Sequence, residues 1–330
     1  MRFPIAAAAL AACLAASPAM AECDPGETVI RFSHTDPADS IRGRGAAALA
    51  REIERAMDGR ACMQVTAGAT DHAEASLVEA LQEGAFEMGA IPTGSLGRVS
   101  PRFLVFDLPF LFDDVESVLA FQASDTGRDL LAEVGRAGLV GLGFWLDGFK
   151  QIAADRAVSA PADLSGLRMG VGESEVARAT AEALGTVPVA AGGDPRALVE
   201  AGRADAVTAS WTDIRERGLD AVQTGFTETN HTISSYVLVA APDFWEGLDA
   251  GLRGEIGLAA KLTAHERNRL AFEVNEAAKH AMLQEGTEIR ELDAAERLAF
   301  KRAMQTVWFG FGGEVGFDQI STALHVNRTR

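Results

Sequence analysis

The sequence predicts an α/β protein of two domains, and three observations lead to this prediction. Strand-like and helix-like segments alternate along the chain, which is typical of mostly parallel sheets covered by helices. The alternation starts afresh in the second half of the chain. The chain has 330 residues, of which about 309 follow a leader segment, and this length suits two domains.

In the first half, short apolar runs predict strands and longer Ala-, Arg- and Glu-rich runs with helical spacing predict helices. The expected strands are residues 28–33, 63–66, 86–91 and 139–145. The expected helices are residues 41–57, 73–83, 116–122 and 128–136. The Pro- and Phe-rich stretch VFDLPFLFDD, from Val105 to Asp114, interrupts the alternation.

The second half repeats the style of folding without repeating the sequence. Its expected strands are residues 167–171, 187–190, 206–210 and 236–240. Its expected short helices are residues 173–184 and 195–201. A helical pattern then runs from Leu252 to Gln284. Helices of this length are uncommon in compact domains, so we expect this one to kink or to bridge the two domains.

Residues 1–21 are typical of a secretory signal peptide. Arg2 supplies the positive charge, Ile5 to Ala16 form the apolar stretch, and Ala19-Met20-Ala21 is the cleavage signal. Glu22 is then the mature start. The apolar stretch is too short to span a bilayer, and no later segment reaches that length. We expect an exported protein without stable membrane insertion; an uncleaved N-terminal anchor is the alternative.

Two cysteines remain after removal of the leader, which contains Cys13. Cys23 and Cys62 then lie in an oxidising compartment, where an even pair favours a disulfide. Each comes just before an expected strand. If those strands are parallel neighbours, their starting ends lie side by side and a bridge is feasible. Two free thiols are the alternative, and neither interpretation makes these cysteines catalytic.

The chain is strongly acidic. Its formal net charge of −17 becomes −18 after removal of the leader, in which Arg2 is the sole charged residue. Nucleic acids and anionic membranes require basic patches, so this charge argues against both as partners. The acidic residues are mostly dispersed along helices, as on a solvated surface. An anionic ligand would need a local exception to this overall field.

The sequence contains no recognisable catalytic motif. A G-x-S-x-G elbow, a P-loop, an H-E-x-x-H pair and a C-x-x-C cluster are all absent. The six histidines are scattered without metal-ligand spacing. We therefore expect no enzyme activity, no metal and no cofactor. An exported protein of two α/β lobes without such motifs suggests a binding protein, with a ligand held in a cleft between lobes that close on it.

Six runs along almost the whole mature chain share one resemblance. They are IRFSH (Ile30 to His34), EALQEGAFEMG (Glu79 to Gly89), VFDLPFLFDD (Val105 to Asp114), GFWLDGFKQ (Gly143 to Gln151), PADLSGLRM (Pro161 to Met169) and YVLVAAPDFWEGL (Tyr236 to Leu248). Together, and in this order, they resemble the extracytoplasmic solute receptors of tripartite ATP-independent periplasmic (TRAP) transporters, of the dicarboxylate-receptor (DctP) type. FDLPFLF and W-x-x-G-F-K-Q are the most specific of these runs.

The resemblance implies a monomeric periplasmic receptor that delivers a small organic solute to a permease with a small and a large membrane subunit. It implies the two-lobed Venus-flytrap fold with a long helix spanning both lobes. Lobe I would contain residues 22–147 and about 236–275, and lobe II residues 148–235 and about 276–330. Presentation of the ligand to a membrane histidine kinase is an alternative role, and a non-carboxylate solute is an alternative ligand.

The resemblance also identifies what the binding site lacks. In the family, the strand after D-L-x-G-L normally carries an arginine whose forked guanidinium binds a ligand carboxylate. That position is Gly170 here. A family asparagine position is Ala209, and an aromatic position falls near Gly193. We expect these truncations to enlarge the cleft, so that it takes a bulkier solute or holds its solute differently. Weak binding by a decayed receptor is a third possibility.

Other residues are candidates for the cleft. Lys150 matches a family position that is often basic, which makes it the best remaining partner for a carboxylate; a surface lysine is the alternative. Arg168, two residues before Gly170, is the other candidate to replace the missing charge. Trp145 and Trp211 are expected either to wall the cleft or to pack in the core.

Three carboxylates and one histidine complete the set of candidates. Glu74, Glu173 and Asp213 each lie at the start of an expected helix, where a carboxylate stabilises the helix N-terminus whether or not it contacts a ligand. Glu173 and Asp213 also flank the altered positions, where they are placed to accept hydrogen bonds from hydroxyls or an amine. His34 ends the first strand, where a structural hydrogen bond and ligand contact are both open.

Overall fold

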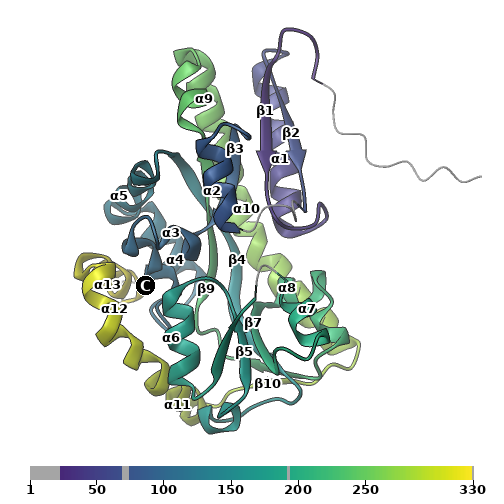
Figure 1. The fold of residues 1–330 in the computed structure, drawn as a ribbon, viewed down its shortest axis with the longest axis vertical. Helices are drawn as coiled ribbons and strands as arrows, with labels where there is room; N and C mark the ends of the chain where they lie inside the picture. The colour runs from purple at the N-terminus through teal and green to yellow at the C-terminus, as the bar shows by residue number, and fades with distance from the viewer. Residues whose placement is uncertain (1–22, 69–73, 192–193, 329–330) are drawn as a thin grey trace, which may run out of the picture.

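The computed structural model describes residues 23–68, 74–191 and 194–328. The expected signal peptide lies outside these residues, as does Gly193. The described chain forms two α/β lobes that share one sheet (Figure 1), which confirms the predicted fold class. We call the part built around strands β1–β3 lobe I and the part built around β5–β8 and β10 lobe II. No described helix has the length and apolar character that crossing a bilayer requires.

The sheet has the strand order β2-β1-β3-β9-β4-β7-β5-β6, with β8 paired to β4 and β10 paired to β8. The strands are β1 (Thr28–Ser33), β2 (Ala61–Thr66), β3 (Met88–Pro92), β4 (Val140–Ala154), β5 (Arg168–Val171), β6 (Val187–Ala190), β7 (Ala206–Ser210), β8 (Gly225–Glu228), β9 (Ile233–Ala240) and β10 (Ile289–Glu291). Neighbours run parallel, as expected, except in the pairs made by β4 and β9. These two antiparallel strands carry the chain between the lobes.

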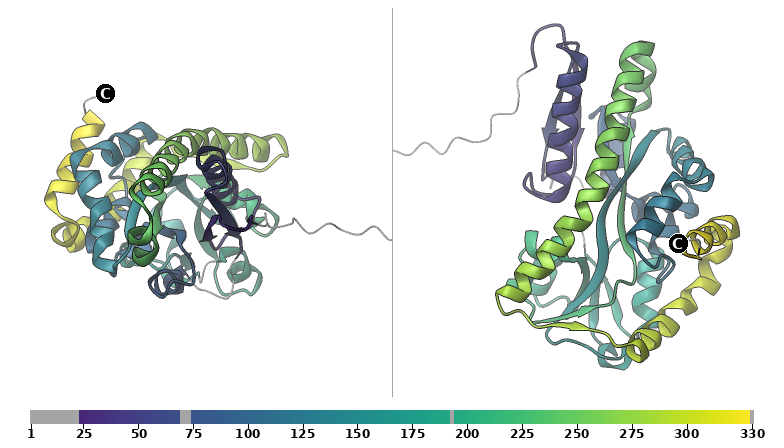
Figure 2. Two further views of the ribbon diagram at one scale, coloured as in Figure 1. Left: turned by 90° about the horizontal axis from the view of Figure 1, so that it is seen from above. Right: turned by 180° about the vertical axis from the view of Figure 1, so that it is seen from behind.

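Helices cover the sheet in both lobes (Figures 1 and 2). They are α1 (Ile41–Met57), α2 (Glu74–Gln82), α3 (Thr93–Leu96), α4 (Val115–Ala123), α5 (Asp125–Ala132), α6 (Glu175–Ala183), α7 (Pro195–Glu200), α8 (Trp211–Glu216), α9 (Pro242–Gly247), α10 (Ala250–Gln284), α11 (Ala294–Met304), α12 (Trp308–Val315) and α13 (Phe317–Arg328). The run VFDLPFLFDD holds the end of a 3-10 turn, η1 (Pro101–Asp107), and the loop after it.

Side-chain caps explain why several helices begin where they do. The Ser40 hydroxyl accepts a hydrogen bond from the Gly43 N–H at 3.0 Å, ahead of α1. A carboxylate does the same for α4 at Asp114 and for α10 at Asp249. Each cap satisfies an N–H group that the first helical turn leaves without a partner.

The long helix α10 confirms the expected bridge. Its 35 residues correspond to about 52 Å at 1.5 Å per residue. It packs on α1 of lobe I, runs along β4 and reaches α8 of lobe II (Figure 2, right). Because it contacts both lobes and the strand that joins them, α10 fixes the geometry of the crossing between the lobes.

The disulfide between Cys23 and Cys62 is present, with a Cα–Cα distance of 5.6 Å. The bridge can form for the reason predicted from the sequence, because β1 and β2 are parallel neighbours. In their register Val29 pairs with Cys62. The bridge therefore ties the segment before β1 to the second residue of β2.

Candidate functional site

A cavity of about 130 Å³ lies where the two lobes meet. Strands β3, β5 and β7 end at it, and the carboxyl ends of such strands are where α/β sheets usually bind ligands. Lobe I contributes the turn after β3 and the end of η1; lobe II contributes the starts of α6 and α8; β4 and β9 pass alongside. Its lining residues include Thr93, Gly94, Ser95, Asp107, Lys150, Gly170, Gly172, Glu173, Ser174, Ala209, Asp213, Arg217, Ser235 and Tyr236.

Lys150 is the cation in this cleft that lies ready for a ligand. Its backbone bonds to Thr232 and His231 hold it on β4. Its ammonium group makes no hydrogen bond or ion pair with any described residue. The other lining cation, Arg217, is already engaged, since its guanidinium pairs with Asp36 and lies 3.5 Å from Asp213.

Asp107 is a buried carboxylate on the lobe I side of the cleft. It is 5% exposed, and its Oδ2 has no hydrogen-bond partner among the described residues. Burial raises the pKa of this carboxyl, while Lys150 and a hydrogen bond from Ser174 lower it. The hydroxyl oxygens of Ser95 and Ser235, which also line the cleft, have no described partner either.

Gly170 lines the cleft, but the space beside it is not empty. A Cβ at this position would lie 2.9 Å from Cγ1 of Val207 and 3.4 Å from Cδ1 of Leu198. Apolar side chains of the lobe II core therefore occupy the space that a longer residue would need. Ala209 also lines the cleft. Glycine at position 170 therefore leaves no open space beside its own backbone, and an enlarged cleft stays a prediction.

Four of the candidate residues lie away from the cleft lining. Trp145 is fully buried in the lobe I core, where the Arg267 guanidinium lies 4.8 Å from its ring centroid. Trp211 is fully buried in the lobe II core against Phe226. Both tryptophans therefore follow the core-packing alternative, and their expected contact with ligand is wrong for this conformation.

Arg168 does not replace the missing arginine. Its guanidinium pairs with Asp205 at 2.6 Å, and its side chain is 45% exposed at the start of β5. His34 is fully buried in lobe I, and neither ring nitrogen has a described partner. Burial lowers the pKa of His34 to about 4, helped by the charges of Arg42 and Arg267. Neither residue lines this cavity, so the structure gives no contact that supports their assignment to the ligand.

The candidate carboxylates Glu173 and Asp213 both reach the cleft. Glu173 lies on its rim, with Oε2 3.7 Å from the Arg98 guanidinium of lobe I. Asp213 is in the first turn of α8 and accepts a hydrogen bond from the Ser210 hydroxyl at 3.0 Å. Arg217 and Arg42 lower the pKa of Asp213 although burial opposes them. Glu74 begins α2, as predicted, but its side chain lies outside the described part of the chain.

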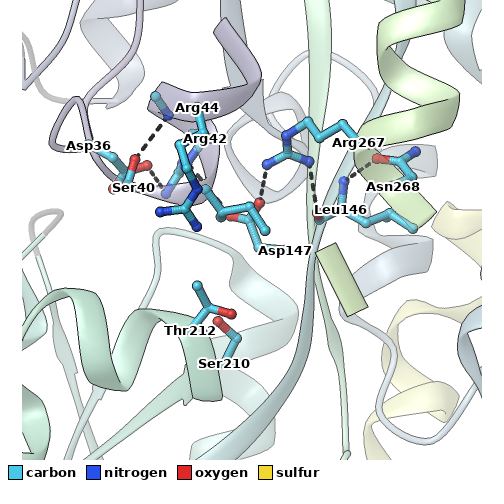
Figure 3. A network of polar contacts seen from close by, with 12 residues as sticks. Asp36, Ser40, Arg42, Arg44, Leu146, Asp147, Ser210, Thr212, Arg267 and Asn268 are labelled. Carbon is cyan, nitrogen blue, oxygen red and sulfur yellow. Dashed lines mark hydrogen bonds and ion pairs between the residues drawn. The ribbon is translucent and has the colours of Figure 1, made fainter. Parts of the chain in front are cut away.

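A buried network of charges lies beside the cleft at the crossing between the lobes (Figure 3). Arg42 at the start of α1 pairs with Asp36 and lies 3.6 Å from Asp147 on β4. Asp147 also accepts from Arg267 of α10 at 2.5 Å. All four side chains are at most 5% exposed. Because these charges are out of water, each depends on its partners in the network.

Among the described residues, ion pairs connect lobe I to lobe II at three places around the cleft. Arg217, just after α8, pairs with Asp36 of the network. Glu216 accepts from the Arg44 guanidinium at 3.0 Å and from the Ile41 N–H at 3.2 Å. The Arg98–Glu173 pair is the third. These pairs hold the two lobes in contact around the cleft.

Sequence reasoning missed Asp107 and Arg217. Asp107 is the one acidic residue of the FDLPFLF run. That run identified the family resemblance, and the resemblance suggested no role for this residue. Arg217 stood in the charged run DIRERG, which reads as a solvated helix face. The signal that was available for Asp107 is a lone carboxylate in an otherwise apolar run, since such groups are rarely buried without a partner.

Comparison with known proteins agrees with this geometry. Residues 32–312 match the family model described as bacterial extracellular solute-binding protein, family 7 (DctP). The chain belongs to this family. A family 7 protein is a solute-binding receptor and not an enzyme, as the sequence predicted. One curated family 7 relative, the C4-dicarboxylate-binding periplasmic protein DctP of Vibrio cholerae serotype O1, is 34% identical over 312 residues, which cover 94% of each chain.

Solved structures of family 7 receptors share the fold. A TRAP periplasmic solute-binding protein from Shewanella oneidensis with bound succinate gives a TM-score of 0.88 at 29% identity, covering 92% of this chain and 100% of that one. A TRAP receptor from Pseudomonas aeruginosa with bound L-malate gives 0.82 at 30% identity, covering 86% and 99%. This chain therefore has the same overall fold as these two receptors.

Proposed function

We propose that this protein is the periplasmic receptor of a TRAP transporter and captures a small organic acid, or a close relative of one, between its lobes. The observation that carries this proposal is the unpaired ammonium group of Lys150 in the interlobe cleft. The relatives that bind C4-dicarboxylates, succinate and L-malate support the same solute class. The receptor would then pass its solute to the small and large subunits of the membrane permease.

The proposed receptor is exported to the periplasm and consists of two lobes. Residues 1–21 would direct export and be removed, leaving a monomer. Lobe I would contain residues 22–147 and about 236–275, and lobe II the remainder. The register shift in β4 between Leu146 and Gly148 supports a boundary there, because an irregularity in a connecting strand is a natural place for a hinge.

Binding would work by closure on the solute. In the open form Lys150 is solvated and its attraction for a carboxylate is weak, whereas closure removes water and strengthens that attraction. The hydroxyls of Ser95 and Ser235, which lack described partners, are placed to donate to the same carboxylate. The interlobe pair between Arg217 and Asp36 would stabilise the closed form that the permease receives. This site is atypical because Gly170 replaces the family arginine.

A thermal-shift screen tests the proposal. Purified mature protein is heated with small carboxylic acids, each compared with its neutral amide or alcohol analogue. A ligand at a hundred times its dissociation constant adds about 2.7 kcal/mol of stability, which is a visible shift. The proposal predicts that one or more acids stabilise the protein and their neutral analogues do not. Stabilisation by neutral solutes alone, or by no solute in the panel, would contradict it.

A further inference from the structure

One oxygen of the Asp107 carboxylate, Oδ2, is a hydrogen-bond acceptor without a described partner in the cleft. Its residue is 5% exposed, and Oδ2 has no hydrogen-bond partner among the described residues. Buried polar groups in proteins are nearly always paired, so a charged oxygen left alone requires an explanation. Since Asp107 lines the ligand cavity, the missing partner is expected to come from what fills that cavity.

Gly94 keeps this oxygen accessible. A Cβ on residue 94 would lie 3.1 Å from Oδ2 of Asp107 and 3.1 Å from Cβ of Ser174. Any side chain at this position would therefore crowd Oδ2 against Ser174, at the start of α6 in lobe II. With glycine there, the carboxylate faces the cavity from lobe I, while the Ser174 hydroxyl, which donates a hydrogen bond to this carboxylate, lies in lobe II.

The charged residues that line the cleft indicate which charge the missing partner of Asp107 should carry. Asp107, Glu173 and Asp213 are acidic, whereas Lys150 and Arg217 are basic. Arg217 is already paired with acidic side chains, and Glu173 faces Arg98. Two cleft carboxylate oxygens lack a described hydrogen-bond partner, Oδ2 of Asp107 and Oε2 of Glu173. The Arg98 guanidinium lies 3.7 Å from Oε2 of Glu173, whereas Asp107 has no ion pair with a described residue. Lys150 and Asp107 are therefore the charged groups left for a solute. A second solute carboxylate placed near Asp107 would be repelled, whereas a donor there would be bound.

We propose that Asp107 is a specificity-determining residue: it selects solutes that carry a hydrogen-bond donor beside the carboxylate that Lys150 binds. The donor is an ammonium or a hydroxyl group, and both offer the N–H or O–H that Oδ2 lacks. This inference rests on the proposed function, since it names the residue that binds a second group of the same solute. An ammonium gains the charge of Asp107 as well as the hydrogen bond, so it is favoured over a hydroxyl.

Titration calorimetry with two matched series of acids tests this. Propanoate, L-lactate and L-alanine differ in carrying hydrogen, hydroxyl or ammonium at one carbon; succinate, L-malate and L-aspartate repeat the comparison with a second carboxylate. The wild-type protein is expected to bind the donor-bearing acids at least tenfold more tightly than the donor-free acid of the same series. Asp107→Asn is expected to lose that preference, by tenfold or more for the ammonium acids and by less for the hydroxy acids, because the amide oxygen still accepts.

Two further variants keep the outcome clear. Gly94→Ala leaves the carboxylate in place but covers Oδ2. This variant is expected to weaken the binding of the same donor-bearing acids, and it replaces Asp107→Asn as the test if that protein is unstable. Asp113→Asn, the same change at an exposed carboxylate six residues further along the chain and outside the cleft lining, is expected to keep the wild-type preference. Equal preferences in wild type and Asp107→Asn, or tightest binding of donor-free acids by wild type, would overturn the role of Asp107 alone. A wild-type protein that binds no acid in either series would overturn the proposed function, and this inference with it.

Discussion

Replacing Gly170 by alanine should destabilise lobe II, because neighbouring side chains already occupy the space. The added Cβ would lie 2.9 Å from Cγ1 of Val207, whereas carbon atoms in contact prefer about 3.5–4.0 Å. Val207 would have to retreat by about 0.6 Å or more. It is fully buried in the lobe II core and has no free side on which to do so.

The expected net cost is about 1 kcal/mol of unfolding free energy. Overpacking of a core typically costs about 1–3 kcal/mol. Alanine regains about 0.5–1 kcal/mol relative to glycine, because the unfolded chain has less conformational freedom to lose. Val207→Ala alone should also destabilise, by leaving a cavity. In the double variant the new Cβ enters that cavity, so the two changes should couple favourably by about 1 kcal/mol or more.

Urea unfolding of the four proteins in the double-mutant cycle measures this coupling. Gly172→Ala is the matched control: it lies just after the same strand, and nothing lies within 4 Å of its added Cβ. We expect the control to be neutral or slightly stabilising. Additive effects of Gly170→Ala and Val207→Ala, or a Gly170→Ala protein as stable as the control, would refute the statement that Val207 fills the space beside residue 170.

Three other predictions concern the buried charges. Asp147→Ala leaves the buried Arg267 guanidinium without its carboxylate partner and removes one of the two carboxylates beside Arg42. Urea unfolding should therefore show a loss of about 3–5 kcal/mol. A loss under 1 kcal/mol would contradict the dependence of the network on this carboxylate. Burial between the lobes raises the pKa of Glu216 to about 7, so closure of the lobes takes up a proton. The affinity for the solute, measured by calorimetry, should therefore rise as the pH falls from 7 to 5. Glu216→Gln should flatten that rise. Burial lowers the pKa of His34 to about 4 and of His231 to about 3, so the unfolded chain binds protons first. Each histidine should therefore cost about 2 kcal/mol of stability at pH 5 relative to neutral pH. Over that range the unfolding free energy of His34→Gln should fall by about 2 kcal/mol less than that of the wild type.

Much of the fold could be predicted because long periodic segments specify their own structure. Strand β1 and helix α1 lie within the predicted bounds, and α10 differs by only two residues at its start. The second half of β4 was missed because Lys150 and Gln151 break its apolar run, although the strand continues between β9 and β7. Strand β10 has only three residues, two of them charged, and pairing with β8 alone makes it a strand.

The site was harder to predict because it depends on distances between lobes. Lys150, Gly170 and Ala209 do line the cleft, since the family pattern places the ends of particular strands there. The pattern cannot tell where a long side chain goes, so Arg168 looked available although Asp205 holds it. It also gave no sign that Val207 fills the space beside Gly170, because that contact joins two different strands.

The most direct test of the central claim is a calorimetric titration of Lys150→Met with an acid that the wild-type protein binds. Methionine keeps the length of the side chain and removes its charge. If Lys150 binds the solute carboxylate, affinity should fall about tenfold to a hundredfold, as expected for the loss of a hydrogen bond to a charged group. The same change at Lys261, exposed on α10, should have no effect. Unchanged affinity in Lys150→Met would show that the carboxylate is bound elsewhere and would contradict the account.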